Sequence, residues 1–164
     1  GAEPSGMTTY YDRVGKYGAD GGLEFQTADD RASEEEVAAI LSQRWNCEFG
    51  RFGHLSALDW FVTRHGRMIG VAELKTRSHP STQFPTVWLN VRKWLALQLM
   101  VVAAGVQATF VVRFTDGIFY CRLADIDAQQ MRVAGCKRVV KARSDIEPVI
   151  DIPVSTLTRV MEAA

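Results

Sequence analysis

Two short apolar strands, each carrying an acid near one end, constrain this chain more than any other feature. The run Leu58-Asp59-Trp60-Phe61-Val62 is followed, after a turn at His65-Gly66, by a second strand that ends in Glu73-Leu74-Lys75. If the strands pair as a hairpin, Asp59 and Glu73 meet at one end of a sheet. Because side chains alternate along a strand, Glu73 and Lys75 project from the same face. Two carboxylates and an ammonium group on one face suit a metal-dependent phosphodiester hydrolase.

A simpler interpretation is that these charges only keep a strand in water. Glu-Leu-Lys is a common tripeptide, and on an exposed strand it has no chemical role. Asp59 weighs against this interpretation because it stands inside an apolar run. A carboxylate in a core is costly unless it is paired or bound to a metal. The hairpin therefore indicates a functional site.

Length and composition suit one globular domain. The chain has 164 residues, of which 47% are hydrophobic, enough for a core of its own. Its 19 basic and 19 acidic side chains cancel, so any nucleic-acid footprint must be local. The three cysteines lie far apart without metal-site spacing, which favours a reducing, intracellular and therefore cytoplasmic setting.

We expect one domain over residues 1–164. Residues 1–6, before Met7, are interpreted as a cloning remnant, residues 7–32 as a loop-rich arm, and about 33–123 as the core. The uncharged run 94–112 approaches the length of a membrane span. Gly105 divides it, however, so we interpret it as a buried helix followed by a buried strand and expect no membrane partner.

Periodicity and turn residues predict an α/β fold, a mixed central β-sheet flanked by helices. Trp60, Trp88 and Trp94 are expected in the core. The predicted helices cover about 33–45 and 89–104, with a shorter one near 124–131 and a terminal one from Val154. The predicted strands cover about 57–64, 67–76, 107–115, 117–123, 137–142 and 147–152, with connections at 49–56 and 77–87.

The hairpin resembles the signature of the PD-(D/E)XK nuclease superfamily, which has the restriction-endonuclease-like fold. Asp59 stands fourteen positions before Glu73-Leu74-Lys75. Upstream, Glu34-x-x-Val37-x-x-Ile40-Leu41 is similar to the acid-bearing helix of Holliday-junction-resolvase-like members. Leu58 stands where the motif is named for proline. Gln98 is followed four residues later by Val102 and not by tyrosine, which argues against the exonuclease branch.

The resemblance implies a metal-dependent nuclease that hydrolyses DNA phosphodiester bonds, a structure-selective or weakly sequence-specific endonuclease of DNA repair or recombination. Asp59, Glu73 and the backbone carbonyl of Leu74 would bind Mg²⁺ or Mn²⁺, because hard cations prefer oxygen ligands. Lys75 would orient or help deprotonate the attacking water and neutralise the phosphate. Glu34 would be a supporting catalytic acid.

Glu36 is the rival of Glu34 for the helix-borne acid, because both positions lie near the apolar face of that helix. Dimerisation is expected if both DNA strands are cut, since each chain has one site. Two alternatives stay open: a nuclease-like fold that binds nucleic acid without cleaving it, and a structural or assembly protein whose acids are surface charge.

Basic side chains near the hairpin are candidates for contacts with DNA phosphates. Arg77, Ser78 and His79 directly follow the strand of Lys75, and Arg92 and Lys93 begin the second predicted helix. A further basic cluster at 137–143 either follows a DNA backbone or protects a charged edge strand from aggregation.

Overall fold

A mixed six-stranded sheet forms the centre of the computed structural model, which describes residues 28–53, 55–134 and 147–162. Its strand order is β1-β2-β3-β5-β6-β9, and only β3 and β5 are parallel. The strands are β1 (Glu48–Arg51), β2 (Trp60–Arg64), β3 (Arg67–Thr76), β5 (Gln107–Phe114), β6 (Gly117–Arg122) and β9 (Thr158–Glu162). The predicted α/β class with a mixed central sheet is confirmed.

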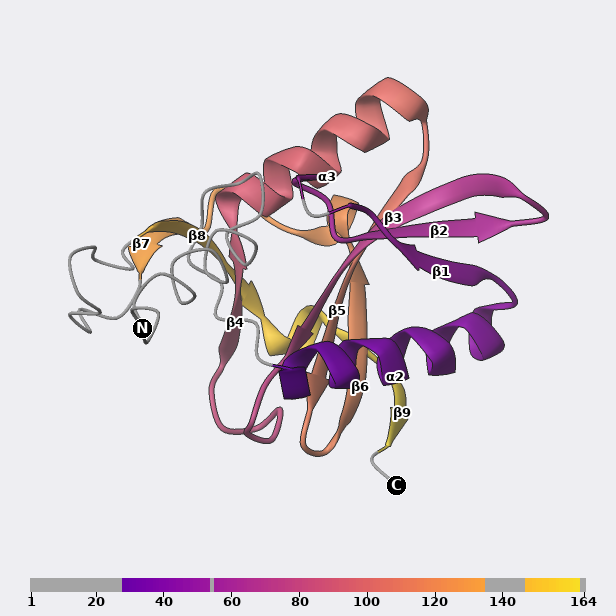
Figure 1. Cartoon of the computed structure of the whole chain (residues 1–164). Coiled ribbons are helices and arrows are strands. Elements are labelled where there is room, and N and C mark those ends of the chain that lie inside the picture. The colour runs from indigo at the N-terminus through magenta and orange to yellow at the C-terminus, as the bar shows by residue number, and fades with distance from the viewer. Residues whose placement is uncertain (1–27, 54, 135–146, 163–164) are drawn as a thin grey trace, which may run out of the picture.

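Two helices lie on opposite faces of this sheet, α2 (Ala28–Trp45) and α3 (Val91–Ala104) (Figure 1). Alternation along β3 divides the core between them. Ala72 and Leu74 pack in the cluster that contains Leu41 of α2, whereas Val71 packs in the cluster that contains Leu97 of α3. Glu73 and Lys75, in phase with Val71, therefore project toward the α3 face.

The ends of α3 follow from its sequence. The Asn90 side chain accepts a hydrogen bond from the backbone N–H of Arg92 at 2.7 Å, which caps the helix N-terminus. Gly105, at a φ of 65°, ends the helix in the left-handed conformation that glycine adopts without strain. Within the described residues, no helix is long and apolar enough to cross a membrane.

A second, antiparallel sheet lies beside the first and has the order β4-β8-β7 (Figure 1). Its strands are β4 (Thr86–Asn90), β7 (Met131–Ala134) and β8 (Glu147–Pro153). One face of β4 and β8 enters the α3-side core through Leu89 and Ile150. Strand β4 runs directly into α3, so the chain visits this second sheet on its way from β3 to β5.

Several predicted elements are wrong. The predicted terminal helix is a short 3₁₀ turn, η2 (Val154–Thr156), followed by β9, which pairs with β6. The predicted helix near 124–131 is reduced to η1 (Leu123–Asp125). β-Branched Thr158 and Val160 favour an edge strand over a helix once β6 offers a partner.

Two strands overlap segments that were predicted to be connections: β1 ends within 49–56, and β4 begins within 77–87. Trp88, expected in the core, is on the outer face of β4 and is 40% exposed. Helix α2 begins at Ala28, five residues before the predicted start. The predicted strand at 137–142, the basic cluster at 137–143 and most of the N-terminal arm lie outside the described residues.

Candidate active site

The register of the hairpin brings Asp59 and Glu73 together. Strand β2 pairs with β3 so that Trp60 lies opposite Ala72 and Phe61 opposite Val71. One step further, the same antiparallel register places Asp59 opposite Glu73. The Asp59 carbonyl is held by the backbone N–H of Phe52 at 3.0 Å, which continues the β1–β2 pairing. The two carboxyl groups are near enough to share one ammonium group, since Nζ of Lys93 lies within 4.0 Å of both.

Glu73 is the most deeply buried acid among the described residues, with only 1% of its surface exposed. Its Oε1 lies 3.2 Å from the Nζ of Lys75, and both side chains leave β3 on the α3 face. Removing a carboxylate from water is unfavourable unless a nearby cation compensates for the lost hydration. The acid and the ammonium group therefore form one electrostatic unit.

Lys93 of α3 is a fourth charged side chain of the group and its second cation, although the sequence predicted it to contact DNA phosphates. Its Nζ lies 2.9 Å from Oδ1 of Asp59 and 4.0 Å from Oε2 of Glu73. It also donates a hydrogen bond to the Ala57 carbonyl at 3.2 Å. Lys93 is only 4% exposed, so its ammonium group does not lie in solvent at the helix start, where a contact with a DNA phosphate was predicted. Its spacing of four from buried Leu97 is the sequence signal for an inward orientation.

The electrostatic balance of the site favours a charged Asp59. Burial alone would raise the pKa of its carboxyl group, but the hydrogen bond with Glu73 and the charges of Lys93 and Lys75 outweigh burial. The pKa of Asp59 is therefore below its ordinary value. The aspartate is ready to bind a cation at neutral pH.

These residues fit a Mg²⁺ or Mn²⁺ ion. Within the described residues no three histidine, cysteine or acidic side chains form a metal cluster. Magnesium sites commonly need only one or two carboxylates, because waters and substrate phosphates complete the octahedron. Asp59 and Glu73 supply that pair. The last residue of β3 that pairs with β2 is Ala72, and β3 continues from there to Thr76. The backbone carbonyl of Leu74 lies in this continuation, directly after Glu73.

Glu34, the predicted supporting acid, lies on α2 and is 9% exposed. Its Oε2 lies 3.1 Å from the Nη2 of Arg51. The Arg51 guanidinium also lies 4.2 Å from the centre of the Trp60 ring. Arg51 thus links Glu34 to the residue that follows Asp59. Sequence reasoning missed Arg51 because its strand was predicted to be a connection.

Glu36, the rival helix-borne acid, points to another partner. Its Oε2 accepts a hydrogen bond from Arg113 of β5 at 2.6 Å, and this contact lowers the pKa of the exposed Glu36 carboxyl group. Arg113 also donates to the Ser33 hydroxyl at 3.3 Å. Glu36 therefore ties α2 to the sheet, away from Asp59 and Glu73.

The predicted phosphate contacts beyond β3 and at the start of α3 differ in exposure. Arg77 extends the β3–β5 ladder, since its backbone N–H donates to the Arg113 carbonyl at 2.8 Å. Ser78 and Arg92 are exposed. His79 is partly buried and lies edge-on against the Phe84 ring, with centroids 4.9 Å apart. Arg77, Ser78, His79 and Arg92 can therefore reach a ligand in solvent.

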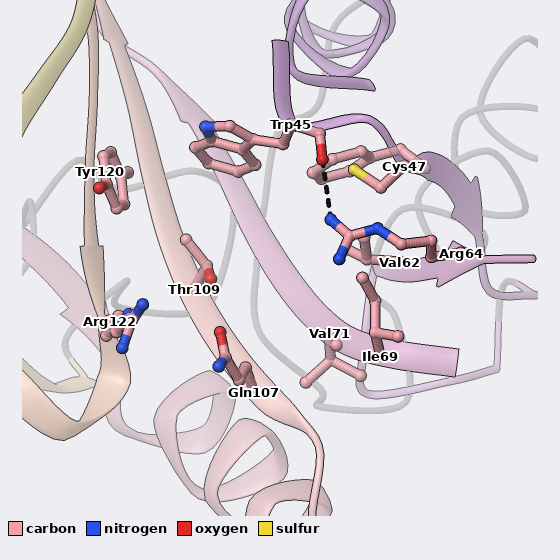
Figure 2. A pocket seen from close by; sticks show the side chains of 12 residues that line it. Trp45, Cys47, Val62, Arg64, Ile69, Val71, Gln107, Thr109, Tyr120 and Arg122 are labelled. Carbon is pink, nitrogen blue, oxygen red and sulfur yellow. Dashed lines mark hydrogen bonds between the residues drawn. The ribbon is translucent and has the colours of Figure 1, made fainter. Parts of the chain in front are cut away.

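Figure 2 shows a separate cavity of about 320 Å³, whose lining includes none of Asp59, Glu73, Lys75 and Lys93. Its walls include Trp45, Val62 and Tyr120, which belong to or pack against the α2-side cluster. Arg64 donates to the Trp45 carbonyl at 2.8 Å and to the Asn46 carbonyl at 2.9 Å, as Figure 2 shows for the former. Arg64 thereby satisfies the C-terminal carbonyls of α2, which is a structural role.

Comparison with known proteins places this geometry in a context. The model of a family described as "Phage putative PDDEXK endonuclease" matches residues 23–160. Among solved structures, the chain is similar to Hjc of Archaeoglobus fulgidus, a Holliday junction resolvase from an archaeal hyperthermophile. The similarity has a TM-score of 0.54 at 11% identity and covers 81% of this chain and 93% of Hjc. No curated protein sequence matches the chain.

Proposed function

Because the chain belongs to this family of phage PDDEXK endonucleases, we propose that it hydrolyses DNA phosphodiester bonds in a reaction that requires Mg²⁺ or Mn²⁺. The resemblance to resolvase-like members, present in the sequence and in the fold, favours a structure-selective or weakly sequence-specific endonuclease. The observation that carries the proposal is the grouping of Asp59 and Glu73 around the ammonium group of Lys93, with Lys75 beside Glu73. A second chain would be needed to cut both strands together.

Each side chain has a role that its position supports. Asp59 and Glu73, with the Leu74 carbonyl, would hold the metal. Bound there, the cation would lower the pKa of the attacking water and offset charge on the phosphoryl oxygens. Lys75, on the same face as Glu73, would orient that water and neutralise the scissile phosphate.

Lys93 and Glu34 would act on the acids and not on the substrate. The buried ammonium group of Lys93 balances the charge of Asp59 when no metal is bound, because it lies 2.9 Å away. Glu34 would hold Arg51 against Trp60, so that the strand carrying Asp59 keeps its position. Glu34 is thus proposed as a supporting acid through this arginine.

A cleavage assay tests the proposal. The protein would be incubated with Mg²⁺ and linear duplex, single-stranded, flapped and four-way-junction DNA. We expect metal-dependent cutting of at least one substrate, and loss of that cutting in Asp59→Asn. Asp125→Asn, at an exposed acid on η1, is the matched control and should cut normally.

A silent nuclease-like module would give the opposite result. Such a protein would bind one of these DNA molecules without cutting it, in Mg²⁺ or in Mn²⁺. Equal cutting by Asp59→Asn and the unsubstituted protein would also reject the proposed site. Melting each variant beforehand separates a lost site from a lost fold.

A further inference from the structure

A groove of about 520 Å³ lies where β3 leaves the main sheet and β4 begins the second one. The residues that matter in its lining share two properties, cationic charge and aromatic rings. The cationic ones are Arg77 and Arg132 and the ring-bearing ones are His79, Phe84 and Trp88, and we call this set the aromatic groove. The nuclease reaction proposed above assigns no part to Phe84, Trp88 or Arg132.

The two largest rings of the aromatic groove are open to solvent. Phe84 is 51% exposed and Trp88 is 40% exposed, although neighbouring Val87 and Leu89 are buried. Strand β4 therefore turns its aliphatic side chains into the core and presents tryptophan outward. Exposed aromatic groups of this size are costly in water, and clustered ones mark binding sites.

Contacts within the groove hold these rings in place. His79 packs edge-on against Phe84 and lies 5.7 Å from the ring of buried Phe114. The guanidinium group of Arg132 is 5.1 Å from the centre of the Trp88 ring. Asp151, which lies opposite Trp88 in the β4–β8 ladder, forms a salt bridge with Arg132. The rings are thus preorganised on strands and a braced loop, which reduces the entropy lost on binding.

The groove continues directly from the proposed active site. Glu73 and Lys75 lie on β3, and Arg77 is the first residue after the strand ends at Thr76. As every second residue of an extended backbone, the three project from the same face. The ladder contact of Arg77 with Arg113 shows that the extended backbone persists this far. Arg77 is two residues beyond Lys75, about 7 Å at the rise of a strand. A DNA strand with a phosphate at Lys75 can therefore run on into the groove.

We propose that the aromatic groove binds unpaired nucleotides of the DNA substrate next to the cleaved phosphate. Bases inside a duplex are stacked on each other and offer no face to a protein ring. Unpaired bases do, and aromatic rings beside basic side chains are how proteins bind single strands without reading sequence. Arg77 and Arg132 supply charge complementary to the phosphates. This inference rests on the proposed function and narrows its substrate to DNA with a single-stranded portion.

Binding measured by fluorescence anisotropy tests the groove separately from catalysis. A labelled oligo(dT) and a blunt duplex of the same length would be titrated in EDTA, so that no DNA is cut. We expect Trp88→Ala to weaken oligo(dT) binding about tenfold, the effect of losing one base–aromatic stack, with duplex binding unchanged. Trp88→Phe should restore most of the affinity. Leu99→Ala, at a 65% exposed side chain of α3, is the control and should change neither.

Phe84→Ala provides an independent second variant, because its exposed ring lies in the loop before β4. Unchanged oligo(dT) binding in both alanine variants would overturn the proposal, as would an equal loss for duplex and oligo(dT). Binding of neither DNA would also overturn it and leave the groove to a protein partner.

Cleavage in Mg²⁺ then separates the two proposals. If the protein cuts duplex and forked DNA equally well with or without Trp88, the groove inference fails while the nuclease proposal stands. If nothing is cut but Trp88 still determines oligo(dT) binding, the groove inference stands and the nuclease proposal fails.

Discussion

The acid site and the aromatic groove lie along one strand, yet they are built in opposite ways. The acid site is mostly closed: Glu73 is 1% exposed and Lys93 4% exposed, whereas the Asp59 side chain is 32% exposed. The groove is open, with Trp88 and Phe84 facing solvent. Charged groups interact more strongly when they are fixed and shielded from water. Aromatic rings that stack on the bases of a flexible DNA strand must instead be accessible.

The largest effect should come from the acid site, and it should leave the groove untouched. Lys75→Ala is expected to reduce the rate of Mg²⁺-dependent cleavage by about 10²–10³-fold, as loss of one transition-state donor does. Oligo(dT) binding in EDTA should stay the same. Single-turnover cleavage and anisotropy would be measured side by side. Arg67→Ala, exposed on the same strand, serves as the control, and a Lys75→Ala enzyme with normal cleavage would contradict the assignment.

Lys93→Met tests how far the closed site depends on its internal cation. Without metal, we expect the free energy of unfolding to fall by about 3 kcal/mol, because removing one partner leaves buried acids uncompensated. Mn²⁺ should then raise the melting temperature more than it does in the unsubstituted protein, since a bound cation replaces the lost charge. Urea unfolding and thermal melting measure both effects. An identical Mn²⁺ response in the two proteins would show that Lys93 and the metal act independently.

The two helix-borne acids can be separated by stability. Glu34→Gln should lower the free energy of unfolding by about 1–2 kcal/mol, because the buried carboxylate loses its charged bond to Arg51. Glu36→Gln should change it less than Glu34→Gln does, because its ion pair with Arg113 is exposed and screened by water. Cleavage rates of both variants would be compared at a temperature where both are folded. A larger catalytic loss in Glu36→Gln would reverse the choice of Glu34.

The smallest effect concerns the loop that carries part of the groove. Asp116 accepts hydrogen bonds from the Ser81 hydroxyl and backbone N–H, at 2.6 and 2.8 Å. These bonds hold the pKa of Asp116 below its ordinary value. Because the folded-state pKa is lowered, the carboxylate stabilises the fold above the ordinary value, 3.8, and this contribution disappears as the pH falls through the lowered pKa.

Asp116→Asn should therefore melt slightly below the unsubstituted protein at neutral pH, with the difference vanishing in strong acid. Melting temperatures recorded across that range give the comparison. A difference that stays constant down to the lowest pH would mean that Asp116 acts through packing and not through its charge.

Local pattern was enough to predict the part of the fold that carries the acids. Alternation placed Glu73 and Lys75 on one face, and the turn at His65-Gly66 set the hairpin that leads back to Asp59. In the structure that turn has positive φ at both residues, 49° and 73°, which suits a tight hairpin. These features depend on neighbours in sequence, which is why they could be predicted.

Features that depend on distant partners could not be predicted. The residues after Thr156 form a strand because β6 offers an open edge. Trp88 faces outward because Val87 and Leu89, at the alternate positions of β4, pack into the α3-side core. Lys93 is buried because α3 packs next to Asp59 and Glu73. In the sequence, only its spacing of four from Leu97 indicates this orientation. Arg51 also depends on a distant partner, because its strand is defined by its pairing with β2.

The parallel pairing of β3 with β5 has a consequence for when the acid site is assembled during folding. Glu73 faces Phe110 across that pair, and the intervening chain must first form β4 and α3. Parallel pairing of strands that are separated by so many residues is a non-local and therefore slow step of folding. Lys93 meets Asp59 only when the intervening chain has folded, so a partly folded chain contains the acids but not their assembled arrangement. Hydrolytic capacity should thus arise together with the finished fold, and not before it.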